Sequence, residues 1–253
     1  MIDFRIQPAG DAALRVEFPA RGDRNGAGRS ARVMEVARRG AGGPADMFDE
    51  GISARVTAIG EVVRARWGGL VRDAVIGYHT VTVYFDPLVV DGRWLEEQLA
   101  AIAADPAAAG DVRGAHIEVP VCYGGDLGPD LGDVAASAGC SEQEVIDLHT
   151  SRSYRVFVVG FVPGFGYMGP VDPRLSLPRR RTPRTKVPAG SVALAAGQTG
   201  IYPMETPGGW HLIGRTPIRP FDESRSEPVL FRPGDRVRFR AIAREEYDAM
   251  SGT

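Results

Sequence analysis

Hydrophobic positions in the first half of the chain alternate between strand and helix spacing. Residues 13–18 (ALRVEF) alternate apolar and polar side chains, as a strand with one buried face does. Further on, an apolar stripe at helical spacing closes at Trp67, and Asp91 stands where it can cap a second helix. The pattern predicts strands at 13–18, 71–76, 80–85 and 116–123 and helices at 52–67 and 94–102. This βαββαβ order is that of a ferredoxin-like α+β domain, with helices on one face of an antiparallel sheet.

Residues 20–50 interrupt this pattern. The segment is rich in Gly, Arg and Ala and has few large apolar side chains that could be buried. Such composition favours a flexible insertion. We therefore expect a first domain over residues 1–112 that carries this insertion.

The second half begins with two short helices and continues with strands alone. Gly139 can end a helix over Leu131–Ala138 headed by Asp130, and Ser141 with Glu144 forms a capping box for Glu142–His149. From Tyr154 onward, short β-rich runs are separated by Gly and Pro turns, which is typical of a closed barrel or a sandwich. The runs are 155–159, 191–196, 211–214 and 236–241. These elements predict a β-barrel domain over residues 113–253.

Composition narrows the class of protein. A formal net charge of -2 gives no global attraction to nucleic acid or to an anionic membrane, and 43% hydrophobic residues are ordinary for a globular protein. No apolar run approaches the roughly 20 residues that span a bilayer. Cys122 and Cys140 lie outside any CxxC pair, so we expect packing roles for both and no metal site. The sequence thus predicts a cytoplasmic protein without nucleic-acid or membrane partners.

Candidate chemistry concentrates in residues 160–216, where Gly and Pro are abundant. Such loops either shape the backbone around a ligand or simply turn tight barrel corners. No acidic residue lies between Asp172 and Glu205, yet this region holds Arg174, Arg179, Arg180, Arg181, Arg184 and Lys186. Uncompensated cations favour a bound phosphate or carboxylate, and the alternatives are a solvated basic loop or a contact with an acidic partner.

Several familiar catalytic motifs are missing from the sequence. It contains no GxxxxGK[ST] loop and no GxGxxG after a strand, so it offers neither a P-loop nor a Rossmann nucleotide site. It also has no GxSxG elbow. Hydrolysis by a serine nucleophile of this chain alone is therefore not expected.

Four sequence blocks in this region resemble one family. Residues 160–169 (GFVPGFGYMG) resemble the GF-hydrophobe-PGFPYLG signature of the 5-oxoprolinase B-subunit family, also described as allophanate hydrolase subunit 1 and as the Kip-type kinase inhibitor. Residues 181–192 (RTPRTKVPAGSV), 197–203 (GQTGIYP) and 207–217 (PGGWHLIGRTP) are similar to its further blocks. Residues 10–14 and 117–126 resemble its opening and its IPVCYGG strand. Gly166 departs from the usual Pro, and His211 from a frequent Gln.

The resemblance implies a fold and an assembly. It implies a ferredoxin-like domain followed by a cyclophilin-like barrel, and an active form that pairs with a homologous cyclophilin-like subunit, with a third, lactam-binding subunit in some members. The implied function is ATP-dependent amide or lactam hydrolysis, with ATP as co-substrate together with Mg²⁺. The alternative within the same family is a regulatory protein that inhibits a sensor histidine kinase. The substrate stays open between 5-oxoproline, allophanate and another amide.

This chemistry leads to a set of candidate residues. Phosphorylating an amide oxygen needs cations and a proton shuttle, for which we predict Arg184 and Lys186 as cations and His149 as the shuttle. The alternative for His149 is a helix C-terminal side chain that interacts with the helix dipole. Phosphate or substrate contacts are predicted from backbone amides, polar side chains and the flanking aromatic residues. These are Gly164, Phe165, Gly166, Tyr167, Ser191, Gln198, Thr199, Gly208, Gly209, Trp210 and Arg215.

Overall fold

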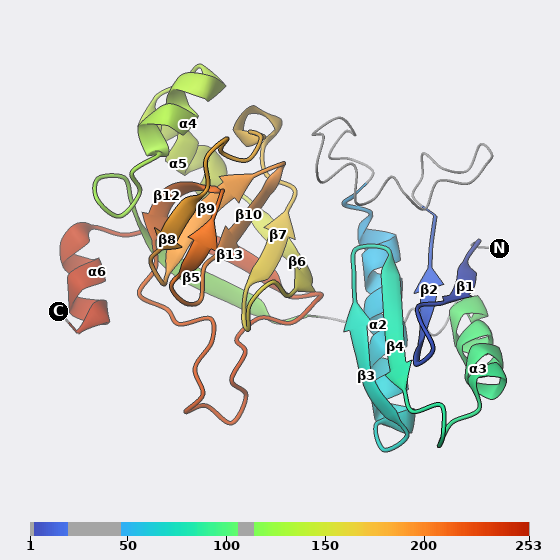
Figure 1. Ribbon diagram of the computed structural model, residues 1–253. Coiled ribbons are helices and arrows are strands. Elements are labelled where there is room, and N and C mark those ends of the chain that lie inside the picture. Colours follow the sequence, from blue (N-terminus) through green and yellow to red (C-terminus); the bar gives the residue numbers. More distant parts are fainter. Residues whose placement is uncertain (1–2, 20–46, 106–113, 253) are drawn as a thin grey trace. The chain divides into compact units, whose positions relative to one another are not determined.

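The alternating apolar residues of the first half form one face of an antiparallel sheet. The computed structural model describes residues 3–19, 47–105 and 114–252, and the chain divides into two compact units, Met1–Arg113 and Gly114–Thr253 (Figure 1). The sheet of the first unit has the order β1-β2-β4-β3. Its strands are β1 (Arg5–Pro8), β2 (Ala13–Glu17), β3 (Val71–Ile76) and β4 (Thr80–Phe85).

Two helices pack on this sheet. They are α2 (Glu50–Trp67) and α3 (Gly92–Ala104), and α2 buries Val56, Ile59 and Val63 against the apolar face. The predicted cap of α3 is confirmed, since the Asp91 carboxylate accepts from the backbone N–H groups of residues 93 and 94. The predicted insertion reaches too far toward the helix, because Phe48 is buried and Asp49 caps α2. Residues 20–46 lie outside the described part of the chain.

One predicted strand belongs to the other unit. The order of elements places β5 (His116–Tyr123) as the fourth strand of the first sheet, and this placement is wrong, although the predicted domain boundary after residue 112 leaves the strand in the second domain. The strand runs parallel to β13 (Arg236–Ala241) over six residue pairs and antiparallel to β12 (His211–Arg215). The fourth place in the first sheet is filled by β1, which pairs with β2.

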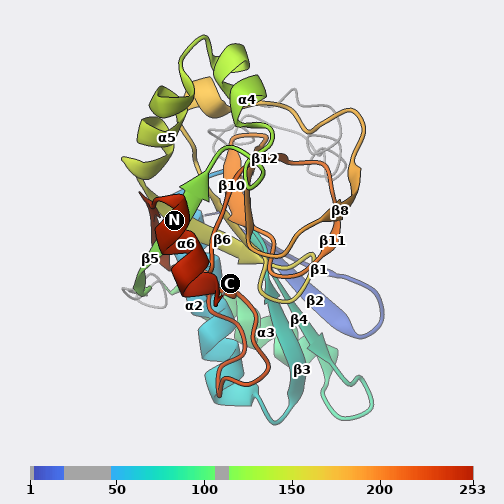
Figure 2. The ribbon, with the colours of Figure 1, turned by 90° about the vertical axis from the view of Figure 1, so that its left-hand side faces the viewer.

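The second unit is a closed barrel, which confirms the predicted α+β architecture of a sheet with helices followed by a β-barrel. Its strand order is β10-β7-β6-β13-β5-β12-β9, and β9 also pairs with β10. Figures 1 and 2 show this unit in two views turned by 90°. The remaining strands of the barrel are β6 (Ser153–Val159), β7 (Gly166–Gly169), β9 (Ser191–Ala195) and β10 (Gln198–Ile201). Two further strands, β8 (Arg184–Val187) and β11 (Thr206–Gly208), form a separate antiparallel pair.

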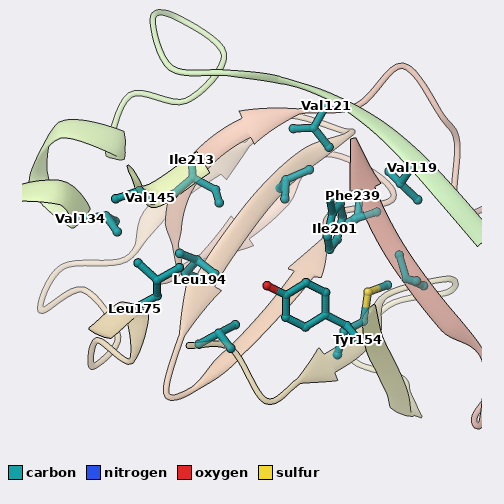
Figure 3. Close-up of a cluster of buried hydrophobic side chains, with 14 of the residues drawn as sticks. Val119, Val121, Val134, Val145, Tyr154, Leu175, Leu194, Ile201, Ile213 and Phe239 are labelled. Carbon is teal, nitrogen blue, oxygen red and sulfur yellow. The ribbon is translucent and has the colours of Figure 1, made fainter. Parts of the chain in front are cut away.

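Side chains from all around the barrel fill its interior. Val121, Ile201 and Phe239 lie in this core, where they are almost fully buried (Figure 3). The helices α4 (Leu131–Ala138) and α5 (Glu142–Thr150) add Val134 and Val145 to the same cluster. The predicted capping box at the start of α5 is present, and Gly139 ends α4 in the left-handed conformation.

Two short helical segments complete the second unit. They are the 3₁₀ turn η4 (Pro173–Leu175) and the C-terminal helix α6 (Arg244–Ser251). Among the residues that the structure describes, no helix is both long and apolar enough to cross a membrane.

Candidate functional site

A buried carboxylate organises the basic segment of the barrel. Asp130, at the start of α4, does not cap its helix through the side chain. Its Oδ1 and Oδ2 atoms each accept a 2.8 Å hydrogen bond from Arg184, and Oδ1 also accepts one of 2.7 Å from Arg180. The backbone N–H of Leu212 donates to Oδ2 at 2.7 Å. Burial alone would raise the pKa of Asp130, but the hydrogen bonds from Arg184 and Leu212 outweigh it and lower that pKa.

The arginine segment is therefore largely compensated. Arg184 is predicted from the sequence as an uncompensated cation for phosphate, but its guanidinium is held bidentate by Asp130. Lys186 pairs with Glu205 at 3.1 Å on the surface, where such a pair contributes little. Arg174 pairs with Asp172. Arg179 and Arg181 are exposed and, among the described residues, have no ion-pair partner.

An aromatic cluster lies beside these arginines. Phe165 packs edge-to-face against Tyr167, Tyr202 and Trp210, with ring centroids 4.8, 5.2 and 5.4 Å away. Phe161 extends this cluster into solvent, because its ring lies 5.7 Å from that of Phe165 while the residue is 61% exposed. Its φ of 69° is rare for a side chain of this size, so the turn holds the ring outward against the backbone preference.

Electrostatics connect the cluster to the free cations. Burial raises the pKa of Tyr167 and of Tyr202, and the charge of Arg179 partly opposes both shifts. Arg179 is thus close enough to both phenols to act on them. The backbone of Arg180 donates to the carbonyl of Gly209 at 2.8 Å, and its side chain reaches Asp130. Arg180, which lies between Arg179 and Arg181, is therefore held through both its backbone and its side chain.

Some of the predicted glycines have a packing reason. A Cβ on Gly208 would lie 2.3 Å from the Tyr202 hydroxyl oxygen, so only glycine admits the buried tyrosine there. Gly164 has a φ of 84°, and a Cβ would meet Phe221 at 2.9 Å. A Cβ on Gly166 would come within 3.1 Å of Met168, while one on Gly209 would meet nothing closer than 3.7 Å. The first three glycines thus serve tight packing, Gly208 against the cluster and the other two against neighbouring residues, whereas a side chain at Gly209 would meet no close contact.

His149 lies inside the barrel, away from solvent. Its Nδ1 is 2.7 Å from the Tyr123 hydroxyl and its Nε2 2.8 Å from the Thr199 hydroxyl, and its ring stacks on Phe239. Burial lowers the pKa of His149 to about 3. A proton shuttle near neutral pH needs a ring that gains and loses protons there, so this environment does not support that role. Thr199 and Gln198 are buried as well, and the hydroxyl of Thr199 is engaged with this histidine.

The buried histidine predicts a pH dependence of stability. Its pKa in the folded chain, about 3, lies below the ordinary value of 6.5, so the unfolded chain binds a proton first as the pH falls. The stabilisation from His149 is complete above pH 6.5 and is lost progressively between there and about 3. We expect the free energy of unfolding to fall faster in this window for the wild type than for His149→Gln, as measured by urea titration at a series of pH values. Parallel curves for the two chains would contradict the assignment.

Arg215 and Ser191, two further predicted site residues, lie outside the cluster around Asp130. Arg215 stands opposite Ser191 on β9 and Cys122 on β5, and it lines a cavity beside α6. Ser191 is fully buried, and its hydroxyl has no hydrogen-bond partner among the described residues. No described hydrogen bond or ion pair joins either residue to the Asp130 cluster. The structure thus gathers Phe165, Tyr167 and Trp210 near the basic segment and places Arg215 outside it.

Sequence reasoning misses three features of this site. The pattern marks Asp130 only as a helix start, although its carboxylate holds two arginines 50 and 54 residues away. Tyr202 and Phe161 each stand inside a family block, 197–203 and 160–169, without a predicted role. One signal in the sequence could have indicated that Asp130 pairs with arginines. An acidic residue stands at the start of a short helix, and a later run of arginines has no acidic neighbours of its own.

Comparisons with known proteins agree on one family. A family model described as carboxyltransferase domain, subdomain C and D, matches residues 42–231. The chain is 47% identical over 157 residues to the B-subunit of 5-oxoprolinase from Bacillus subtilis (strain 168), covering 62% of this chain and 64% of that protein. For the 5-oxoprolinase B-subunit of Escherichia coli O157:H7 the identity is 46% over 175 residues, covering 66% and 76%.

A solved structure is similar in both fold and sequence. The crystal structure of TTHA0988 is similar with a TM-score of 0.70 and 38% sequence identity, covering 78% of this chain and 38% of that one. The alignments thus span 64% of the B. subtilis protein and 38% of the TTHA0988 chain.

Proposed function

This chain belongs to the 5-oxoprolinase B-subunit family, and on that premise we propose that it is one subunit of an ATP-dependent amidohydrolase that opens 5-oxoproline. The observation that carries the proposal is a pair of exposed arginines, Arg179 and Arg181, that have no ion-pair partner in the described part of the chain. The charge of Arg179 acts on Tyr167 and Tyr202 of the aromatic cluster, and Arg181 lies two residues further along the same segment. A lactam is a poor electrophile, and phosphorylating its oxygen activates the ring carbon for attack by water. The C–N bond then breaks and the ring nitrogen leaves as the amine, and a second water releases phosphate from the acyl phosphate that remains. That chemistry develops negative charge, which positioned cations stabilise.

The residues of this chain then take distinct parts. Arg179 and Arg181 bind the oxygens of the phosphoryl group or of the substrate carboxylate. Asp130 holds Arg180 and Arg184 and so fixes the segment that presents the two free arginines. Tyr167 and Trp210 form the apolar wall of the proposed reaction site and limit the access of water to it. His149 is left out of the proposed site, and Lys186 stays a surface residue.

We propose ATP, with Mg²⁺, as the co-substrate of the assembled enzyme. The chain has no P-loop and no Rossmann motif, so the nucleotide site is expected to need a second protein. The proposed partners are a homologous cyclophilin-like subunit and a lactam-binding subunit. The exposed ring of Phe161 on its strained turn is a suitable anchor for the first of these, because large aromatic side chains dominate interface energetics.

The assembly predicts that the purified chain alone is inactive. We expect no 5-oxoproline-dependent ADP release from this chain by itself, and substrate-dependent release after the cyclophilin-like and lactam-binding subunits are added. Allophanate and urea serve as competing substrates in the same coupled assay. Robust ADP release by the isolated chain would contradict the shared site. A complex that releases no ADP with any of the three, while the chain inhibits autophosphorylation of a sensor histidine kinase, would favour the regulatory alternative.

A further inference from the structure

A cavity of about 450 Å³ opens on the barrel beside the C-terminal helix α6. Its volume falls within the range of small-molecule sites. All but one of its lining residues carry charged or hydroxyl groups, and Leu127 is the exception. The lining residues are Asp126, Leu127, Arg215, Arg244, Tyr247, Asp248 and Ser251.

Strand register explains how Arg215 comes to face this cavity. Residues directly opposite each other on antiparallel strands point to the same side of the sheet. Arg215 is opposite Cys122 of β5, and Cys122 packs with Leu127 and with Tyr247 of α6 in a small apolar cluster. The side chain of Arg215 therefore lies on the outer side of the barrel, under α6. Val121, the neighbour of Cys122, points the other way into the barrel core (Figure 3).

The charges around the cavity are unevenly paired. Arg244 is paired with two carboxylates, because it donates to Asp126 at 2.7 Å and to Asp248 at 3.0 Å. Arg215, by contrast, makes no hydrogen bond or ion pair among the described residues, and its Nε is buried without a partner. A buried donor without an acceptor costs roughly 1–3 kcal/mol. The structure thus retains a guanidinium at the wall of a cavity whose buried Nε has no acceptor among the described residues.

We propose that this cavity binds the carboxylate of a small organic acid, with Arg215 as its cationic ligand. The planar guanidinium matches a carboxylate, and the hydroxyl groups of Ser251 and Tyr247 supply further donors. The nearby carboxylates of Asp126 and Asp248 repel a dianion more strongly than a monoanion, which favours carboxylate over phosphate. This site is separate from the proposed reaction site around Arg179 and independent of its assignment.

The test is isothermal titration calorimetry of the purified chain with sodium propionate, against sodium chloride and sodium phosphate. We expect saturable binding of propionate that is weakened at least about tenfold by Arg215→Gln. Ser251→Phe, at the exposed end of α6, blocks the cavity without touching Arg215 and is expected to abolish binding. Arg238→Gln, an exposed arginine of β13 that does not line the cavity, is the matched control and keeps wild-type affinity.

The outcomes separate the two sites. Propionate binding that survives both Arg215→Gln and Ser251→Phe, or tighter binding of phosphate, would overturn the proposal. So would the absence of saturable heat with the wild-type chain. Loss of propionate binding in an Arg179→Ala, Arg181→Ala variant, with binding kept in Arg215→Gln, would place the acid at the reaction site instead. A cooperative melting transition in each variant confirms that the chain is folded when binding is lost.

Discussion

Asp130→Asn is expected to destabilise the barrel by about 2–3 kcal/mol. The substitution keeps the size of the side chain but removes the negative charge that pairs with Arg180 and Arg184. The NH₂ group of the asparagine would also face the N–H donors of the arginines in place of an acceptor oxygen. Breaking a buried ion pair costs about 3–5 kcal/mol, and the partial exposure of the two arginines brings the value to the lower end. Urea unfolding followed by Trp210 fluorescence, in a chain with Trp67→Phe and Trp94→Phe, measures the effect.

The pH dependence of the same variant gives an internal check. The pKa of Asp130 in the folded chain is lowered, so its stabilisation is present above the unfolded value near 3.8 and is lost as the pH falls through the folded value. The difference between wild type and Asp130→Asn should stay constant at neutral pH and shrink below about 4. Asp133→Asn, an exposed position in the first turn of the same helix, serves as control with a change within about 0.5 kcal/mol. An equally small change for Asp130→Asn would show that the ion pairs of Asp130 with Arg180 and Arg184 do not stabilise the barrel.

The second large effect is expected on turnover. Replacing both Arg179 and Arg181 by Ala in the reconstituted complex should lower 5-oxoproline-dependent ADP release at least about a hundredfold, because each charge on a developing phosphate contributes about 1.4 kcal/mol or more. The melting temperature should change little, because both side chains are exposed and without ion-pair partners among the described residues. Lysine at both positions should restore part of the rate, since a point charge lacks the bidentate fork.

Arg174→Ala is the matched control for these variants. This arginine is exposed, lies in the same basic segment and pairs with Asp172, so its loss should leave the rate unchanged. Activity of the double variant that returns at high concentration of the partner subunit would show that the two arginines serve the interface. In that case the assignment of the reaction site would be wrong, although the family would still hold.

Local patterns predicted most of the elements. The helix over Leu131–Ala138 and the capping box at Ser141 and Glu144 were found as predicted, because a helix start and a left-handed glycine end depend on neighbours a few residues away. The barrel strands β6, β9, β12 and β13 were found for a similar reason, since apolar residues recur along each and turn residues separate them, whereas the four-residue strands β7 and β10 were not predicted. The family blocks were likewise identified from the sequence, because each is a contiguous stretch of residues.

Strand partners could not be found in this way. His116–Tyr123 has the pattern of a half-buried strand in either domain, and nothing within it identifies the distant segment Arg236–Ala241 as its parallel neighbour. The prediction followed the order of elements and placed it in the wrong sheet. Pairing is decided by which backbone edges the folded core brings together, and that is a property of the whole chain.

The sequence by itself thus determined most helices and longer strands, the fold class and the family, because these rest on spacing along the chain. It missed short strands such as β7 and β10 and the helix α6, where strands alone were expected. The tertiary structure alone decided which charges are free. The cations of the basic segment, without acidic neighbours in sequence, looked alike, and folding paired Arg180 and Arg184 with a carboxylate 50 and 54 residues away. It also buried His149 and set Arg215 apart beside α6. The physical reason is that charge compensation and burial depend on distances through space, which the closed barrel fixes.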